Sequence, residues 1–200
     1  MDKDLMLESA IQSIPYVGSS IATLYFGKKE KKRFERLESF YSKLNEELEK
    51  VKKSISKLEN HNLDELVSLI EEINEKVENE RTELKIKYYK NLFTKSLIHP
   101  VKDCFNERKY FVDLISSLTQ VHINILAILY QTSDFVNQFY LIKSGIDKDL
   151  VKGFTQQLDN SGLINSQLDS IGFSNTGGTF NQRISLTELG KRFYYFCIQD

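Results

Sequence analysis

The chain has 200 residues, with 40% hydrophobic residues, 28% charged residues and a formal net charge of −1. This composition is typical of a folded chain with one ordinary domain or two small ones, and it excludes general disorder. The balanced charge argues against nucleic-acid binding over the whole surface and leaves only local basic patches to consider. Two prolines, nine glycines and long Lys/Glu/Leu-rich runs predict a mainly α fold.

Residues 1–27 are expected to form an apolar N-terminal arm. No charge occurs from Ser9 to Gly27, a stretch nearly as long as a membrane span. Serines, Gln12 and Pro15 dilute its apolar residues, so the stretch is too polar for an ordinary single span. We expect a cytoplasmic protein whose arm packs on this chain or on an oligomer partner, with membrane insertion as the alternative. The expected contact residues are Tyr16, Val17, Ile21, Leu24 and Tyr25.

Residues 28–98 carry the most regular pattern in the chain. Apolar residues recur at alternating spacings of three and four from Phe34 to Leu58, and the pattern resumes from Leu63 to Leu84. Heptad spacing of this kind predicts two helices of an antiparallel coiled-coil hairpin. Asn62 is expected to cap the second helix. A coiled coil between chains is the alternative, and a homo-oligomer could use both.

A fold at residues 60–61 pairs positions whose numbers total 121, for example Leu37 with Leu84. The second helix is expected to continue to His99, because Pro100 follows it. This register brings two basic runs to the same end of the hairpin, where we expect contact with an anionic partner. The residues are Lys28, Lys29, Lys31, Lys32, Arg33 and Arg36 in the first run, and Lys85, Lys87, Lys90 and Lys95 in the second.

The C-terminal part is expected to consist of a connecting helix in residues 99–117 and a small α+β domain in residues 118–200. Helices are predicted at residues 118–130, 135–143 and 147–160. Gly177–Gly178 favours a tight β-hairpin, followed by a strand at residues 180–186 and a last helix from Thr187. Three helices followed by a strand, a wing and a second strand are the order of a winged helix.

A winged helix suggests DNA binding through its third helix, but the charges of this module argue otherwise. Residues 118–200 carry six bases and seven acids, whereas phosphate neutralisation normally supplies much of the affinity for DNA. We therefore favour a winged helix that contacts protein, with a DNA-binding regulator as an alternative. The residues that could contact nucleic acid are Lys148, Lys152, Gln156 and Arg183.

No motif predicts catalysis, a cofactor or a metal. The three histidines His61, His99 and His122 have no partner at metal-ligand spacing, and no phosphate-binding loop or nucleophile elbow occurs. Cys104 and Cys197 lack CxxC spacing and are expected to be reduced thiols. We therefore expect a non-enzymatic protein.

The stretch "ERKYFVDLISSLTQVHINILAIL", residues 107–129, precedes the winged-helix-like part. Together with the apolar arm and the basic coiled coil, this layout resembles the Abi-alpha-like bacterial proteins of the DUF4393 family. The resemblance implies a bacterial accessory role, related to phage defence, with no catalytic residues to carry over. The residues that carry it are Phe111, Leu118, Thr119, His122, Ile125 and Leu126.

Overall fold

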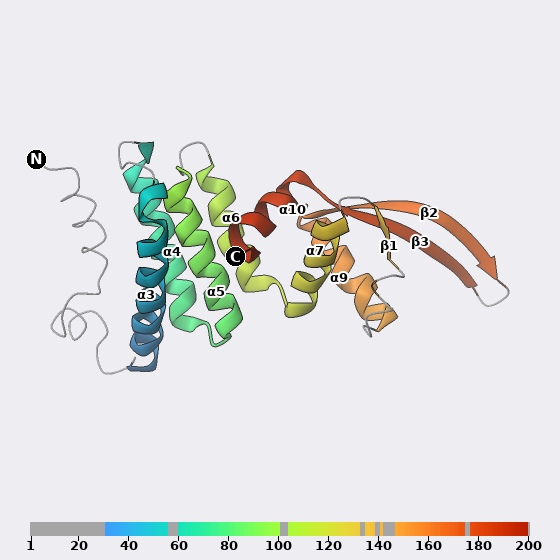
Figure 1. Cartoon of the computed structure of the whole chain (residues 1–200). Coiled ribbons are helices and arrows are strands. Elements are labelled where there is room, and N and C mark those ends of the chain that lie inside the picture. Colours follow the sequence, from blue (N-terminus) through green and yellow to red (C-terminus); the bar gives the residue numbers. More distant parts are fainter. Residues whose placement is uncertain are drawn as a thin grey trace, which may run out of the picture. The chain divides into compact units, whose positions relative to one another are not determined.

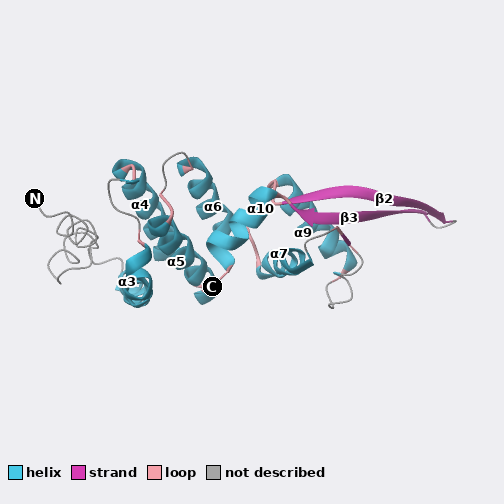
Figure 2. Ribbon diagram, turned by 45° about the horizontal axis from the view of Figure 1, so that its top comes forward, coloured by secondary structure: helices cyan, strands magenta, loops and turns pink. Residues whose placement is uncertain are grey.

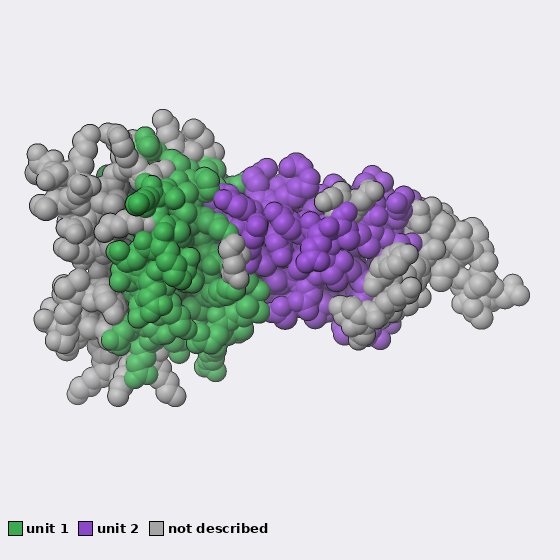
Figure 3. Space-filling model, in the orientation of Figure 1, with its two compact units in different colours: residues 1–116 green, residues 117–200 purple. Residues whose placement is uncertain are grey.

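The computed structural model describes residues 31–55, 60–100, 104–132, 135–138, 141, 147–174 and 177–199. The arm of residues 1–27, with its five expected contact residues, lies outside this part, as do Lys28 and Lys29. The chain forms two compact units, residues 1–116 and 117–200 (Figure 3). The prediction of a mainly α fold is confirmed, and a three-stranded antiparallel sheet accompanies the helices. None of the helices described is both long and apolar enough to cross a membrane.

The described residues of the first unit form the α-helices α3, α4, α5 and α6 (Figure 1). Their bounds are α3 Lys31–Val51, α4 Leu63–Asn79, α5 Glu83–Ile98 and α6 Phe105–Ser117, with a 3-10 turn, η1 Lys52–Ser54, after α3. As predicted, the Asn62 side chain caps α4 by accepting a hydrogen bond from the backbone of Glu65. Because the η1 turn after α3 ends at Ser54, the connection to α4 starts before the predicted turn at residues 60–61.

Most heptad residues of α3 and α4 are buried within this chain, whereas Leu63 at the start of α4 is 43% exposed. Leu37, Tyr41 and Leu44 are each less than 9% exposed. The buried apolar set of these helices comprises Leu37, Phe40, Tyr41, Leu44 and Leu48 of α3, and Leu66, Leu69, Ile73 and Val77 of α4. The first unit therefore already covers most of the apolar face that an intermolecular coiled coil would need.

The predicted register between the first two helices is wrong by one heptad. Arg36 donates to the backbone oxygen of Glu78, and the Tyr41 hydroxyl donates to Asn74 Oδ1 at 2.6 Å. The residue numbers of these two pairs add up to 114 and 115, about seven less than the predicted sum of 121. Because apolar positions repeat every seven residues, the shifted register still pairs apolar residues with each other. Heptad spacing alone could not distinguish the two.

The predicted long second helix is also wrong, because the chain reverses at residues 80–82. The Glu80 carboxylate accepts hydrogen bonds from the backbone N–H groups of Arg81 and Thr82, both at 2.8 Å. Partial burial disfavours the charged carboxylate, but hydrogen bonds from Thr82 and Arg81, together with the charge of Lys85, outweigh it and hold the pKa of Glu80 below its ordinary value. The carboxylate thereby stabilises the turn from α4 into α5.

The reversal buries α5 on most of its surface. Tyr88, Tyr89, Leu92, Phe93 and Leu97 are all less than 9% exposed. A helix that is buried on several sides is expected to be apolar over much of its circumference. The wide distribution of apolar residues around α5 is therefore explained by burial among several helices, and a two-helix hairpin would have buried only one side of α5.

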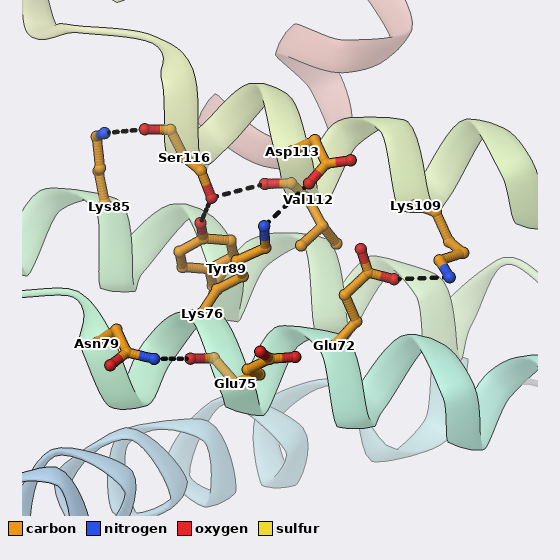
Figure 4. Close-up of polar contacts among 10 residues, drawn as sticks. All are labelled: Glu72, Glu75, Lys76, Asn79, Lys85, Tyr89, Lys109, Val112, Asp113 and Ser116. Atoms are coloured by element: carbon orange, nitrogen blue, oxygen red, sulfur yellow. Dashed lines mark hydrogen bonds and ion pairs between the residues drawn. The ribbon is translucent and has the colours of Figure 1, made fainter.

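Helix α6 packs on α4 and α5 through ordered polar contacts (Figure 4). Lys76 of α4 lies 3.0 Å from the Asp113 carboxylate. The hydroxyls of Tyr89 on α5 and Ser116 on α6 are 2.7 Å apart. A second ion pair joins Lys109 to Glu72 at 3.1 Å. These contacts orient α6 over the reversed helix pair.

The described residues of the second unit form the α-helices α7, α9 and α10 and a sheet with strand order β1-β3-β2; Figure 2 shows the long β2–β3 hairpin. Strands β2 and β3 form a long hairpin with a bulge between Leu168 and Ser170. A π-helix, η3 Tyr194–Ile198, follows the last helix. The bounds are α7 Gln120–Thr132, β1 Val136–Asn137, α9 Lys148–Asn160, β2 Ile164–Ser174, β3 Gly177–Leu186 and α10 Glu188–Phe193.

The helix predicted for residues 135–143 is wrong at its start. Val136 and Asn137 instead form β1, which pairs with Ile184 and Arg183 of β3. The backbone N–H of Gln138 continues this pairing to Gln182 O at 2.9 Å. A strand of two residues has no periodicity of its own, so only its long-range partner decides its conformation.

The last helix begins where the sequence predicted, at Thr187, but the hairpin turn does not lie at Gly177–Gly178, because both glycines belong to β3. Ser174 pairs with Gly177 at the end of the hairpin. The Thr187 hydroxyl accepts from the Gly190 N–H at 2.9 Å and donates to Gly162 O at 2.6 Å. Gly162 has a φ of 69°, a value that favours glycine after a helix C-terminus.

Candidate functional site

Helix α9 is held against the second unit by one face. At its start, Asp147 Oδ1 accepts from the N–H of Asp149 at 2.9 Å. Val151 and Leu158 are fully buried, and the Thr155 hydroxyl donates to Val151 O at 2.9 Å. These contacts fix the helix so that its opposite face points to solvent.

The solvent face of α9 is the candidate interaction surface, called here the α9 surface. Leu150 is 54% exposed, so this face of α9 offers one large apolar side chain to solvent. A Cβ added at Gly153 would meet no atom within 4 Å. The surface consists of Asp149, Leu150, Lys152, Gly153, Gln156, Gln157 and Asn160.

His122 lies buried behind α9 and fixes how α7 meets it. Its ring contacts Phe154 edge-on, with centroids 4.7 Å apart. Its Nδ1 accepts from the Thr119 N–H at 3.0 Å, and the Thr119 hydroxyl lies 2.9 Å from the same atom. Burial lowers the pKa of His122, so the ring is neutral at pH 7. The contact between His122 and Thr119 could have been found from the sequence, because a polar side chain three residues after a helix N-cap is typical of a capping box.

The charges of the α9 surface balance. Asp149 offsets Lys152, and the amide of Gln156 donates to Asn160 Oδ1 at 3.0 Å. Lys148 is the first residue of α9. Arg183 is exposed on β3, where its guanidinium lies 5.9 Å from the centre of the Phe135 ring. The expected nucleic-acid contacts thus include exposed groups but no cluster of cations.

The second basic run does not join the first, so the expected convergence of the two is wrong. Lys43 of α3 lies 2.7 Å from Glu83, at the start of α5, and Glu47 lies 3.5 Å from Lys90. Both helices therefore advance in the same direction, and the lysines of α5 extend away from the N-terminal end of α3. The break at residues 80–82 causes this difference.

Several of these bases serve the fold of the first unit. The Arg36 guanidinium binds Glu78 O, and Lys85 donates to Ser116 O at 2.6 Å, so each cation satisfies a carbonyl near a helix end. Lys87 borders a groove of about 280 Å³ between α3 and α5. Lys31, Lys32 and Arg33 begin α3, and Lys95 lies in the last turn of α5.

Within the described residues, no group of three or more His, Cys, Asp or Glu could hold a metal ion. Cys104 is half-buried and Cys197 is buried, and the two do not form a disulfide. The α9 surface offers an apolar side chain among neutral amides, a chemistry suited to contact with another macromolecule. Comparison with protein-family models, with curated proteins and with solved structures gave no match.

Proposed function

We propose that the chain is a non-enzymatic interaction protein whose C-terminal unit is a winged helix that binds a protein through the α9 surface. Support for the winged helix comes from the order α7, β1, α9, β2, β3 and from the strand order β1-β3-β2. The order of helices and strands does not determine which partner a domain binds. The partner is therefore inferred from the chemistry of the exposed surface.

The observation that carries the proposal is the neutral α9 surface around exposed Leu150. A helix that reads DNA relies on Lys and Arg beside it to bind phosphates. Here Lys152 is balanced by Asp149, and the neighbouring groups are amides and Gly153. An exposed apolar residue with neutral polar neighbours matches the central part of a protein interface better than a phosphate track.

Site-specific photocrosslinking tests this proposal. A benzophenone side chain replaces Leu150 in the full chain, and a second variant carries it at Glu46, an exposed residue of α3. Irradiation in cells of the organism that encodes the chain should give a discrete protein adduct from position 150 and none from position 46. Equal labelling at both positions, or no adduct from position 150, would contradict the proposal.

DNA binding is the second candidate, because α9 occupies the position of a winged-helix recognition helix. Fluorescence anisotropy with labelled duplex DNA tests it at about 100 mM salt, where electrostatic binding remains measurable. The protein-binding proposal expects no salt-dependent increase in anisotropy. Binding that weakens with added salt, and that Lys152→Ala reduces while Lys53→Ala in η1 does not, would favour DNA instead.

The biological setting stays a prediction. We propose the bacterial accessory role in phage defence that the resemblance to Abi-alpha-like proteins implies. Plaque counts on an encoding host, with and without the gene, test it. Equal counts over a broad phage panel would argue against this role.

A further inference from the structure

The connection between α4 and α5 can become helical without steric conflict. It consists of Glu80, Arg81 and Thr82, with neither glycine nor proline. The backbone of Glu80 is extended at φ −78°, ψ 137°, and that of Thr82 at φ −92°, ψ 110°. Both φ values are already near those of a helix, so rotation of ψ alone would largely bring these residues into helical geometry.

The sequence across this connection also favours a continuous helix. Val77 and Leu84 lie seven residues apart, so the apolar seam continues through it. Glu and Arg are good helix formers, and Thr is tolerated. The reversal is held locally by the Glu80 carboxylate, whereas the Thr82 side chain makes no hydrogen bond that caps α5.

A single chain gains nothing by joining the helices, because the apolar face of α5 would leave its site on α3 and α4. Residues such as Tyr89, Leu92 and Phe93, each at most 2% exposed, would then meet water. Two chains avoid this loss. Helix α5 of each can occupy the same site on the other, which restores the contacts and adds the helical hydrogen bonds of residues 80–82.

We propose that this chain forms a domain-swapped dimer in which α4 and α5 join into one helix across residues 80–82. Each α5 then packs on α3 and α4 of the second copy. Because α6 follows α5, the Lys76–Asp113 and Lys109–Glu72 ion pairs form between the chains. This inference concerns the first unit and is independent of the α9 surface.

A proline at position 83 distinguishes the two states. Glu83 is the first residue of α5, where proline is tolerated, and Thr82 before it already has the extended backbone that proline requires. In a joined helix, the same ring would clash with the carbonyl of Asn79 and remove a hydrogen bond. Glu83→Pro should therefore keep the monomer and weaken the dimer by at least about a hundredfold. Glu83→Ala is the matched control, since it also removes the ion pair to Lys43.

The full chain is refolded over a range of concentrations, and its mass is measured by size-exclusion chromatography with light scattering. Wild type and Glu83→Ala should give a dimer whose share rises with concentration. The double variant Glu80→Ala/Thr82→Ala should strengthen the dimer by about tenfold or more, since each dimer contains two connections. A monomer throughout for wild type and the double variant, or equal dimerisation of Glu83→Pro and Glu83→Ala, would overturn the proposal.

Spin-label distances separate a swapped dimer from one that associates side by side. Labels are placed at exposed Asp64 and His99 in a Cys104→Ser background, and labelled dimers are diluted with excess unlabelled chain. In the reversed chain these sites are close, because His61 interacts with the backbone of Leu97. Across a joined helix they are about 50 Å apart. A dimer that shows the long intrachain distance supports the swap, and a dimer with only the short distance refutes it.

Discussion

Gly190 is the position where a single methyl group should disturb the second unit most. A Cβ added there would lie 2.0 Å from Leu163 O and 3.0 Å from a methyl carbon of Leu186. The opposing atom at 2.0 Å belongs to the backbone, so no side-chain rotation can relieve the contact. The start of α10 and the start of β2 would have to separate by roughly 1.5 Å to reach ordinary contact distance.

The cost of Gly190→Ala follows from the contacts at this place. Overpacking typically costs about 1–3 kcal/mol. The separation would also weaken the Thr187 cap, whose hydroxyl accepts from Gly190 N–H, at about 1 kcal/mol. Replacing glycine by alanine in a helix returns up to about 1 kcal/mol. We expect a net loss of about 2 kcal/mol in the free energy of unfolding of the second unit.

Gly153→Ala is the matched control, because its added methyl group meets nothing within 4 Å on α9. It should raise stability by up to about 1 kcal/mol. Urea unfolding followed by circular dichroism gives the stabilities, and hydrogen exchange assigns the change to residues 117–200. Equal stabilities of the two variants, or a Gly190→Ala protein as stable as wild type, would refute the close approach of α10 to Leu163.

Three further predictions concern single contacts. The free energy of unfolding should fall by up to about 1.4 kcal/mol for each pH unit below about 6.5, because His122 binds a proton in the unfolded chain more readily than in the folded one. The variant His122→Gln, which can still accept a hydrogen bond from Thr119, should reduce this pH dependence in urea titrations. An unchanged pH dependence would contradict the assignment to His122. Arg36→Lys should lower the free energy of unfolding by about 1 kcal/mol, since lysine cannot donate the same pair of hydrogen bonds to Glu78 O. A variant as stable as wild type in urea unfolding would exclude that role. Thr187→Ala should cost about 1 kcal/mol with faster hydrogen exchange in α10, and unaltered exchange would rule out the cap.

The candidate site was partly readable from sequence. Lys152, Gln156 and Arg183 were singled out as possible nucleic-acid contacts, and each is exposed in the structure. The exposure of Leu150 was not predicted, because an apolar residue in an amphipathic helix is normally assigned to the buried face. The residues of α9 that face solvent are decided by which other elements cover the helix. The local sequence pattern does not contain this information.

The sequence by itself determined the features that arise from local chemistry. Heptad spacing predicted the buried face of α3, the capping side chain of Asn62 started α4, and Thr187 started the last helix. Periodicity and turn chemistry act over a few residues, so a single sequence contains them in full.

Only the tertiary structure decided the reversal at residues 80–82, the register of α3 with α4, and strand β1. Residues 80–82 suit a helix as well as a turn, and the burial of Tyr89 and Phe93 on α5 favours the turn. A heptad seam fits equally well when shifted by seven residues, and Val136 becomes a strand only by pairing with Ile184. In each case local preference is nearly equal between two states, and contacts between distant residues select one.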